Sequence, residues 1–347
     1  MSDGWKPSYQ AVNELGVQVE LAGLLQGALA SGFLAHCRKP VSGAELAGAT
    51  GLERGVVDDV CDALRAIGVL VDGEDDADGE GGADGAQHDH VVISDLYAPL
   101  LEPGVDHRAL NRLAAAGVRA AMLRGLFEKS PTSYWSIDSA ARLALASNAT
   151  ADPATEFGRE SLVGTVRADA EWDGIFSRGA RFLDLGCGVA GGIVSFLHHY
   201  PRVTAVGIDI AEDVLDVARS RALALGVADR ARFLVADAAS FRDPEPFDVV
   251  FWPHTFYPEP SRSAALATAF ANLRPGGLLV TVNIPPRPPR AAAAGAAIDP
   301  LLRKLWGIEE RSLEALTTEL EEAGFTGITA AAVVPPVLPL IKAYRPE

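Results

Sequence analysis

The sequence has few cysteines, few basic residues for its length and no long apolar run. Three cysteines, at positions 37, 61 and 187, are too few and too scattered for a disulfide framework or a zinc cluster. No stretch reaches the roughly 20 apolar residues of a membrane span, and the opening MSDGWKPSYQ lacks the basic and apolar regions of a signal peptide. We therefore expect a cytoplasmic protein with reduced thiols and no membrane contact.

Positive charge is also scarce. The 347 residues include 30 Lys and Arg against 46 Asp and Glu, for a net charge of −16. Residues 1–100 are the most acidic part, with 5 Lys and Arg against 17 Asp and Glu. A protein that binds nucleic acid without sequence preference needs a basic face, so this class is excluded. The length allows two domains, each with its own core.

The first segment, residues 1–105, is predicted to be a small, mostly helical domain. Residues 11–37 place Val12, Leu15 and Val19 on one face of a helix. Ser42 and Glu45 stand at capping-box spacing, so a short helix should begin there. Residues 53–71 predict a further helix that runs into a strand.

A flexible acidic loop should follow at residues 72–90, which carry eight acids and no apolar period. A strand and turn at 90–101 then complete the order of a winged helix. The acidic helix and loop would repel phosphates. An apolar helix face needs more partner surface than so small a domain supplies, which favours dimerisation instead.

Residues 106–178 predict a helical linker with scattered aromatic residues. We expect Tyr134 and Trp135 to line a substrate pocket, because ligand sites favour apolar walls. His107, at an expected helix start in the same region, is a further candidate for substrate contact.

Strands and helices alternate through residues 179–347. The predicted strands lie at 181–186, 203–209, 231–237, 247–252 and 277–284, followed by two at the end of the chain that a short connection joins as a hairpin. Such alternation indicates an α/β fold with a mostly parallel, Rossmann-like sheet and helices on both faces. A seven-stranded sheet with an antiparallel seventh strand follows from the hairpin.

A glycine-rich loop follows the first of these strands, in FLDLGCGVAGG (182–192). Asp184 precedes Gly186, Asp209 lies 23 residues after Gly186, and Asp237 closes the third strand. Ligands of such sheets bind at the carboxyl ends of strands. The glycines and Asp209 suit either a dinucleotide or S-adenosylmethionine (SAM). Asp184 would repel a pyrophosphate but suits the ammonium of an amino-acid tail, so SAM is favoured.

Residues 180–345 resemble class I SAM-dependent methyltransferases. FLDLGCGVAGG, VGIDIAEDVLDVAR, FLVADAASF, FDVVFW and LRPGGLLV stand in that family's order and spacing. The whole chain is similar to the small-molecule O-methyltransferases that carry an N-terminal winged-helix dimerisation domain. PVSGAELAGATGLERGVVDDVCDALRAIGVLV matches the pattern of that domain.

The resemblance implies a role for each residue around the loop. Asp184, Gly186 and Gly188, with Cys187 between the glycines, would hold the methionine part of SAM. Asp209 would bind the ribose. Backbone near Trp252 would face the methionine amino group. The adenine would lie beside three residues, namely Ile210, Asp237 and Ala238.

The catalytic base is less clear from the resemblance. Related O-methyltransferases use His-Asp-Trp after the fourth strand, and alignment on Pro258 places Thr-Phe-Tyr there instead. His254, one residue earlier, is the candidate base, and Tyr257 is a candidate substrate contact. We expect no metal, because His88-Asp89-His90 and His198-His199 do not fall on the loops around the site.

Four functions remain open at this point. The first is methylation of a small molecule, a specialised metabolite, with oxygen favoured as acceptor and carbon or nitrogen as alternatives. The second is other chemistry on bound SAM. The third is a regulator with a ligand-sensing domain, and the fourth is a hydride-transferring enzyme. The sequence does not identify the acceptor, because the segments that shape its pocket carry no recognisable motif.

Overall fold

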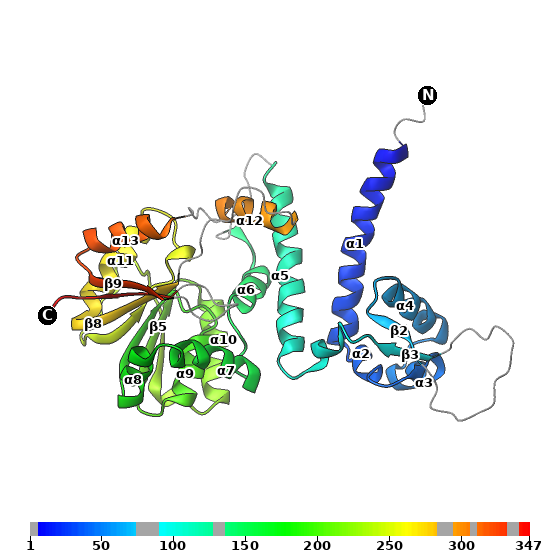
Figure 1. The fold of residues 1–347 in the computed structure, drawn as a ribbon, viewed down its shortest axis with the longest axis horizontal. Coiled ribbons are helices and arrows are strands. Elements are labelled where there is room, and N and C mark those ends of the chain that lie inside the picture. Colours follow the sequence, from blue (N-terminus) through cyan, green and yellow to red (C-terminus); the bar gives the residue numbers. More distant parts are fainter. Residues whose placement is uncertain (1–5, 74–89, 128–135, 283–293, 306–310, 332–339) are drawn as a thin grey trace. The chain divides into compact units, whose positions relative to one another are not determined.

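The computed structural model describes residues 6–73, 90–127, 136–282, 294–305, 311–331 and 340–347 (Figure 1). The chain divides into two compact units, Met1–Ala114 and Ala115–Glu347. The sequence predicts domain boundaries at 105 and 178. No described helix is both long and apolar enough to cross a membrane.

The N-terminal unit contains four helices and a small antiparallel sheet. The helices are α1 (Lys6–Ala30), α2 (Phe33–His36), α3 (Gly43–Thr50) and α4 (Arg54–Ala66). The strands β1 (Val41–Ser42), β2 (Leu70–Asp72) and β3 (His90–Ile93) lie in the order β1-β3-β2. The predicted acidic loop lies almost entirely outside the described residues.

Local sequence explains where these helices begin and end. Ser42 accepts a hydrogen bond from the backbone of Glu45, whose carboxylate accepts one in return, so the predicted capping box is confirmed. The single helix expected over 11–37 was wrong, because Gly32, with φ of 77°, breaks it into α1 and α2. Leu34, Leu46 and Leu64 are fully buried in this unit's core.

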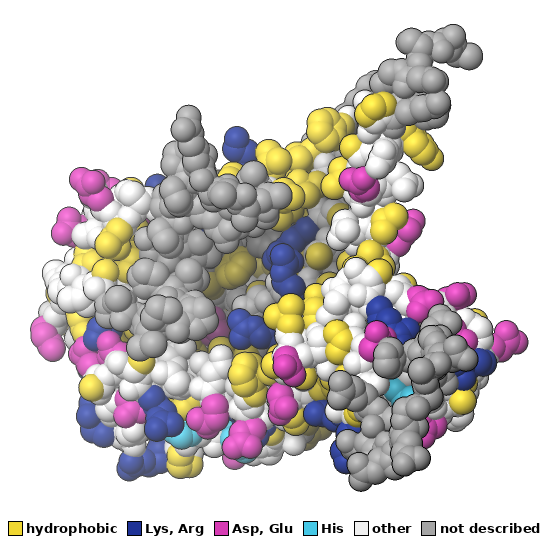
Figure 2. All heavy atoms as spheres, turned by 45° about the vertical axis from the view of Figure 1, so that its right-hand side comes forward, with side chains coloured by type: hydrophobic (Ala, Val, Ile, Leu, Met, Phe, Trp, Pro, Cys, Tyr) yellow, Lys and Arg dark blue, Asp and Glu magenta, His cyan; other side chains and the backbone are white. Residues whose placement is uncertain are grey.

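The face of α1 predicted to be apolar is exposed. Val12, Leu15 and Val19 have exposed fractions of 66%, 70% and 72%. Hydrophobic side chains stand out along this helix in Figure 2. Since they contribute nothing to this unit's own core, the fold gives them no packing partner there.

Helices dominate the next segment, as predicted. They are α5 (Val105–Gly125), which begins in the N-terminal unit, then α6 (Ser139–Ala149), α7 (Glu156–Arg167) and α8 (Ala170–Arg178). A 3₁₀ turn, η2 (Ala98–Leu101), precedes them. Side chains of Asp138, Thr155 and Asp169 cap the last three helices by accepting backbone N–H bonds.

The C-terminal unit is built on a seven-stranded sheet, ordered β6-β5-β4-β7-β8-β10-β9. Its strands are β4 (Arg181–Leu185), β5 (Thr204–Asp209), β6 (Ala231–Val235), β7 (Phe247–Phe251), β8 (Leu273–Val282), β9 (Thr326–Ala331) and β10 (Leu340–Tyr344). Strands β4 to β8 are parallel, and β10 pairs antiparallel with both β8 and β9. The predicted Rossmann-like sheet and its antiparallel strand are confirmed.

Helices cover both faces of this sheet, because alternate strand residues point to opposite sides. Phe182 packs with α7, α8, α9 (Gly191–His199) and α10 (Glu212–Ala224). Leu183 faces the other side, toward α11 (Ser261–Asn272) and α13 (Leu313–Glu322). The remaining helix, α12 (Ala294–Leu305), packs through Leu302 and Leu305 against α5 and α6.

Candidate active site

The glycine-rich loop turns sharply where β4 ends. Gly186 and Gly188 have φ values of 76° and 52°, which residues with a side chain rarely adopt. The N–H groups of Gly186 and Cys187 both donate to the Ile208 carbonyl, at 2.9 Å each. A Cβ on Gly207 would lie 2.7 Å from Cys187 Sγ, so a glycine in β5 leaves room for this loop.

The three predicted carboxylates meet at one edge of the sheet. Asp184 lies in β4, Asp209 ends β5, and Asp237 follows β6; all three line one cavity of about 1180 Å³. The parallel register explains this convergence, since Leu185 pairs with Ile208 and Asp209 with Val235.

Asp209 is held by the backbone around it. Its two carboxylate oxygens accept hydrogen bonds from Gly188 N–H at 2.9 Å and Ala211 N–H at 3.0 Å. Each oxygen keeps a further lone pair for a ligand. Burial raises the pKa of Asp209, and the backbone donors oppose that rise. The carboxylate is therefore fixed in place with acceptor capacity directed at the cavity.

Asp184 is the most perturbed acid of the site. Its side chain is buried, and Oδ1 has no hydrogen-bond partner among the described residues. Burial, followed by the nearby Asp209 carboxylate, raises its pKa from 3.8 to about 7. A buried acid without a partner is costly unless a cation pairs with it, so the site is suited to a positively charged group.

The turn after β6 forms a third part of the wall. Asp237 Oδ1 accepts a hydrogen bond from Ala239 N–H at 2.8 Å, and Ala238 lines the cavity beside it. Ile210, after β5, is half exposed and lies on the same wall. The sequence predicted all three residues of this wall, Ile210, Asp237 and Ala238.

The segment after β7 carries the backbone near Trp252 that the resemblance predicts to face the methionine amino group. Phe251, Pro253, Thr255 and Tyr257 line the cavity. Trp252 does not: its side chain is fully buried in the core between the sheet and α11. The Trp252 carbonyl accepts hydrogen bonds from Thr281 Oγ1 and from His254 N–H.

His254 also points away from the cavity. Its side chain is 4% exposed, is absent from the cavity lining, and lies with its ring centroid 5.5 Å from that of Trp252. Burial lowers its pKa to about 4, a hydrogen bond to the Val282 backbone opposes this, and Arg311 adds to the lowering. The imidazole is therefore neutral at pH 7, without the geometry of a base.

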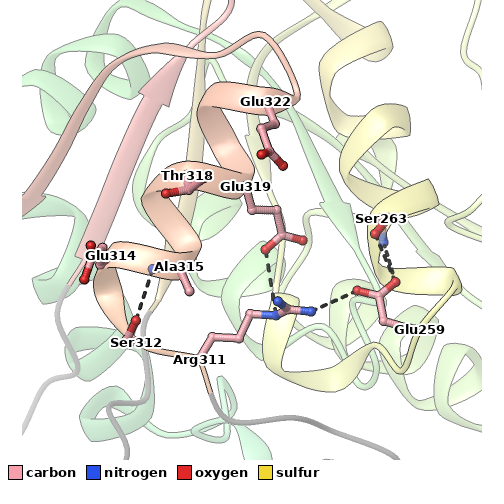
Figure 3. Close-up of a pocket in the computed structure, with 9 residues that line it drawn as sticks. All are labelled: Glu259, Ser263, Arg311, Ser312, Glu314, Ala315, Thr318, Glu319 and Glu322. Carbon is pink, nitrogen blue, oxygen red and sulfur yellow. Dashed lines mark hydrogen bonds and ion pairs between the residues drawn. The ribbon is translucent and has the colours of Figure 1, made fainter.

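An ion-pair cluster fastens this segment to α13 (Figure 3). Arg311 lies between Glu259, at 3.1 Å, and Glu319, at 3.9 Å. Arg262, only 4% exposed, also pairs with Glu319 and lies over the Trp252 ring. These ion pairs join the segment after β7, through Glu259 and Arg262, to Arg311 and to Glu319 of α13.

The rest of the cavity is apolar and comes largely from helices before the sheet. Its wall consists of residues from α6, α7, α8, α9, the strands and the 3₁₀ turn His254–Phe256, among them Leu145, Leu162, Trp172, Phe182, Phe196, Phe256, Val282 and Leu340. The sequence singled out Trp172 only as one of several aromatics. Arg142, which binds Asp213 at 2.5 Å, and Thr150 also line the cavity and were missed.

Three other substrate contacts were predicted, His107, Tyr134 and Trp135. His107 is in the N-terminal unit and is absent from the cavity lining. Tyr134 and Trp135 lie outside the described residues. The described part of the chain holds no cluster of three or more metal-ligating residues.

The charge of the cavity favours SAM over a dinucleotide as its ligand. Among the described lining residues, five carboxylates (Asp184, Asp209, Glu212, Asp213 and Asp237) accompany one cation, Arg142. A pyrophosphate would be repelled, whereas the ammonium and sulfonium of SAM would be attracted. The unpaired Asp184 oxygen, the Asp209 acceptors and the loop without bulky side chains fit SAM.

Comparison with known proteins shows which class shares this fold. The chain has the fold of the class I SAM-dependent methyltransferases that carry an N-terminal helical domain. Residues 182–277 match the family model described as a methyltransferase domain, which confirms the predicted fold and resemblance for this part.

Curated relatives match about a third of the chain. A ubiquinone biosynthesis O-methyltransferase from Pseudomonas fluorescens is 35% identical over 120 residues, covering 34% of this chain and 51% of that protein. A demethylmenaquinone methyltransferase from Thermus thermophilus is 35% identical over 113 residues, or 32% and 50% of the two chains. The chain thus spans about half the length of these relatives.

Solved structures match nearly the whole chain. An O-methyltransferase family protein from Burkholderia thailandensis has a TM-score of 0.69 at 18% identity, covering 98% of both chains. The mitomycin 7-O-methyltransferase MmcR has 0.66 at 20% identity, covering 99% of both. Human N-acetylserotonin methyltransferase, solved with SAM, has 0.65 at 15% identity, covering 100% of both. At these identities the likeness concerns the fold.

Proposed function

We propose that this protein is a SAM-dependent methyltransferase that methylates a hydroxyl oxygen of a small, largely apolar acceptor. The observation that carries the proposal is the convergence of Asp184, Asp209 and Asp237 on one cavity beside the glycine-rich loop. The methyltransferase domain match over 182–277 supports it.

Each carboxylate has a distinct role in this proposal. Asp184 neutralises the ammonium of the cofactor, Asp209 accepts hydrogen bonds from the ribose hydroxyls, and Asp237 with Ala238 binds the adenine edge. Gly186, Cys187 and Gly188 bring backbone close to the methionine part. SAM supplies a methyl group on a positively charged sulfur, which the nucleophilic atom of the acceptor attacks directly. The chain's main contribution is alignment of the two reactants.

The apolar end of the cavity is the proposed acceptor site. Leu145, Leu162, Trp172 and Phe256 contribute walls that suit a ring system. Structural neighbours named for mitomycin and calicheamicin biosynthesis support a specialised metabolite as acceptor. Carbon or nitrogen methylation, and chemistry other than methylation, are the alternatives.

The geometry of the segment after β7 does not favour His254 as the catalytic base. Thr255, not His254, stands on the cavity wall where the related enzymes have histidine. His254 as a base remains a prediction from sequence that its burial does not support. We propose that alignment and the acidity of the acceptor hydroxyl provide most of the rate.

The test is an incubation with SAM and a panel of phenols, enols, amines and carbon nucleophiles, followed by mass spectrometry. Methylation adds one CH₂ to the acceptor and releases an equal amount of S-adenosylhomocysteine (SAH). Loss of CO₂ or gain of oxygen without SAH release would point to the non-methylating alternative. Failure to bind SAM or SAH at all would contradict the proposal.

We further propose a cytoplasmic homodimer assembled through a winged-helix-like N-terminal unit. The exposed Val12, Leu15 and Val19 on one face of α1 support this, because exposed apolar stripes mark interfaces. Light scattering should give twice the chain mass of 36.4 kDa. Leu15→Glu should shift the protein toward the monomer; an unchanged dimer would show that α1 is not the interface.

A further inference from the structure

The hydroxyl of Tyr257 lies beside the glycine-rich loop. A Cβ placed on Gly186 would lie 2.9 Å from the Tyr257 Oη and 3.8 Å from Pro253 Cγ. The side chain of Tyr257 lines the same cavity as the three carboxylates. The ring therefore closes over the turn that is proposed to hold the methionine part of the cofactor.

This hydroxyl is buried and has no hydrogen-bond partner among the described residues. Nearly all buried polar groups in native proteins are paired, because an unpaired one costs about 1–3 kcal/mol. Asp184 Oδ1, on the same wall, is unpaired in the same way. Two buried polar atoms without partners, both on residues that line one cavity, indicate that a bound molecule completes both.

The charges around Tyr257 indicate what kind of atom it meets. Burial, then Asp209, Asp184, Cys187 and Asp237, raise the pKa of its hydroxyl well above the usual value of 10.0. The phenol is therefore neutral, and its oxygen lies in a field of negative charge. A positive centre beside that oxygen is stabilised, while a negative one is repelled.

The cofactor has two positive centres, and they match two different groups of the protein. Asp184, an acid that needs a counter-charge, suits the ammonium. The Tyr257 hydroxyl approaches Gly186, and Tyr257 lines the cavity together with its neighbours Phe256 and Pro258. The sulfonium belongs to the methionine part that Gly186 is proposed to hold, so it would lie near this hydroxyl.

Given the proposed SAM-dependent function, we propose that the Tyr257 hydroxyl oxygen contacts the sulfonium end of SAM and makes the protein prefer SAM to its neutral-sulfur product SAH. This differs from the sequence interpretation of Tyr257 as a substrate contact. The interaction is between a charge and an oriented dipole in a site of low dielectric constant, so removing the oxygen should weaken SAM binding about tenfold.

The experiment is calorimetric titration of the wild type and Tyr257→Phe with SAM and, separately, with SAH. We expect the dissociation constant for SAM to rise about tenfold in the variant, and that for SAH to change by less than about twofold. Equal weakening of both ligands, or no change in either, would overturn the inference. A wild type that binds neither ligand would instead overturn the proposed function.

Tyr200→Phe is the matched control. Its hydroxyl donates to Asp173 at 2.6 Å, at the end of α9 opposite the loop, and does not line the cavity. This variant should leave both dissociation constants unchanged. Thermal denaturation without ligand checks folding: Tyr257→Phe should match or exceed the wild type, because it removes an unpaired hydroxyl, and a clear loss of stability would contradict the inference.

Discussion

Replacing Asp184 by asparagine should separate the stability of the ligand-free protein from its affinity for SAM. The carboxyl is buried, its Oδ1 is unpaired among the described residues, and Asp209 lies nearby. The amide keeps the size and shape of the acid but cannot ionise. Asp184→Asn therefore removes a strained charge while preserving the packing.

The size of the stability difference between the two proteins follows from the pKa of Asp184, which is raised from 3.8 to about 7. Between these two values the folded protein keeps a proton that the unfolded chain has lost. The free energy of unfolding then falls as pH rises, by about 1.4 kcal/mol per pH unit. The loss is complete above pH 7, where it amounts to roughly 4 kcal/mol, and it vanishes below pH 3.8.

Urea denaturation of both proteins without ligand, from pH 4 to pH 8, measures this effect. We expect equal stability at pH 4 and an advantage of roughly 2–4 kcal/mol for Asp184→Asn at pH 8. Glu319, whose pKa burial also raises to about 7, is present in both proteins and cancels in the difference. A difference that does not vary with pH would refute the reasoning.

The same substitution should reduce the stabilisation that SAM gives the protein. In the wild type, an ammonium beside Asp184 favours the ionised carboxylate, so added SAM should stabilise the protein more at pH 8 than at pH 5. Asp184→Asn should bind SAM about a hundredfold more weakly, as expected for loss of a buried charge pair. Unchanged affinity would mean that the ammonium lies elsewhere.

Three further predictions concern the neighbouring groups. Asp209→Asn should raise the SAM dissociation constant roughly 10- to 100-fold through loss of charged acceptors, measured by calorimetry, whereas the exposed Asp216→Asn should have no effect. His254→Gln should change kcat less than about tenfold while lowering Tm. A 10²–10⁴-fold loss of kcat would instead show that His254 acts as the base. Arg262→Met should cost roughly 1–3 kcal/mol in urea denaturation, because the partly buried Glu319 loses a charged hydrogen-bond partner; a loss below 1 kcal/mol would show that Arg262 is not needed there.

The residues at the cofactor end of the site could be predicted from the sequence because their positions follow from the topology of the sheet. Parallel strands bring their carboxyl ends to one edge, so the order of strands along the chain is enough to place Asp184, Asp209 and Asp237 together. The assignment of individual roles to them remains a prediction. Gly186 was similarly predictable, since its φ of 76° requires glycine.

The segment after β7 was not predictable in the same way. A short 3₁₀ turn at His254–Phe256 decides which side chains face the cavity and which face the core. A shift of one residue in such a turn exchanges His254 for Thr255, and single-residue sequence patterns do not specify it. The apolar wall from α6 to α8 depends on tertiary packing, which local patterns do not encode.

The order of the strands also has a consequence for how the protein is made. Strand β9 joins the sheet through β10, which follows it in the chain and lies between it and β8. During synthesis β9 can therefore pair with the sheet only after residues 340–344 have emerged from the ribosome. A deletion that removes those five residues would leave β9 without a pairing partner in the sheet. Such a deletion should therefore be more destabilising than its small size suggests.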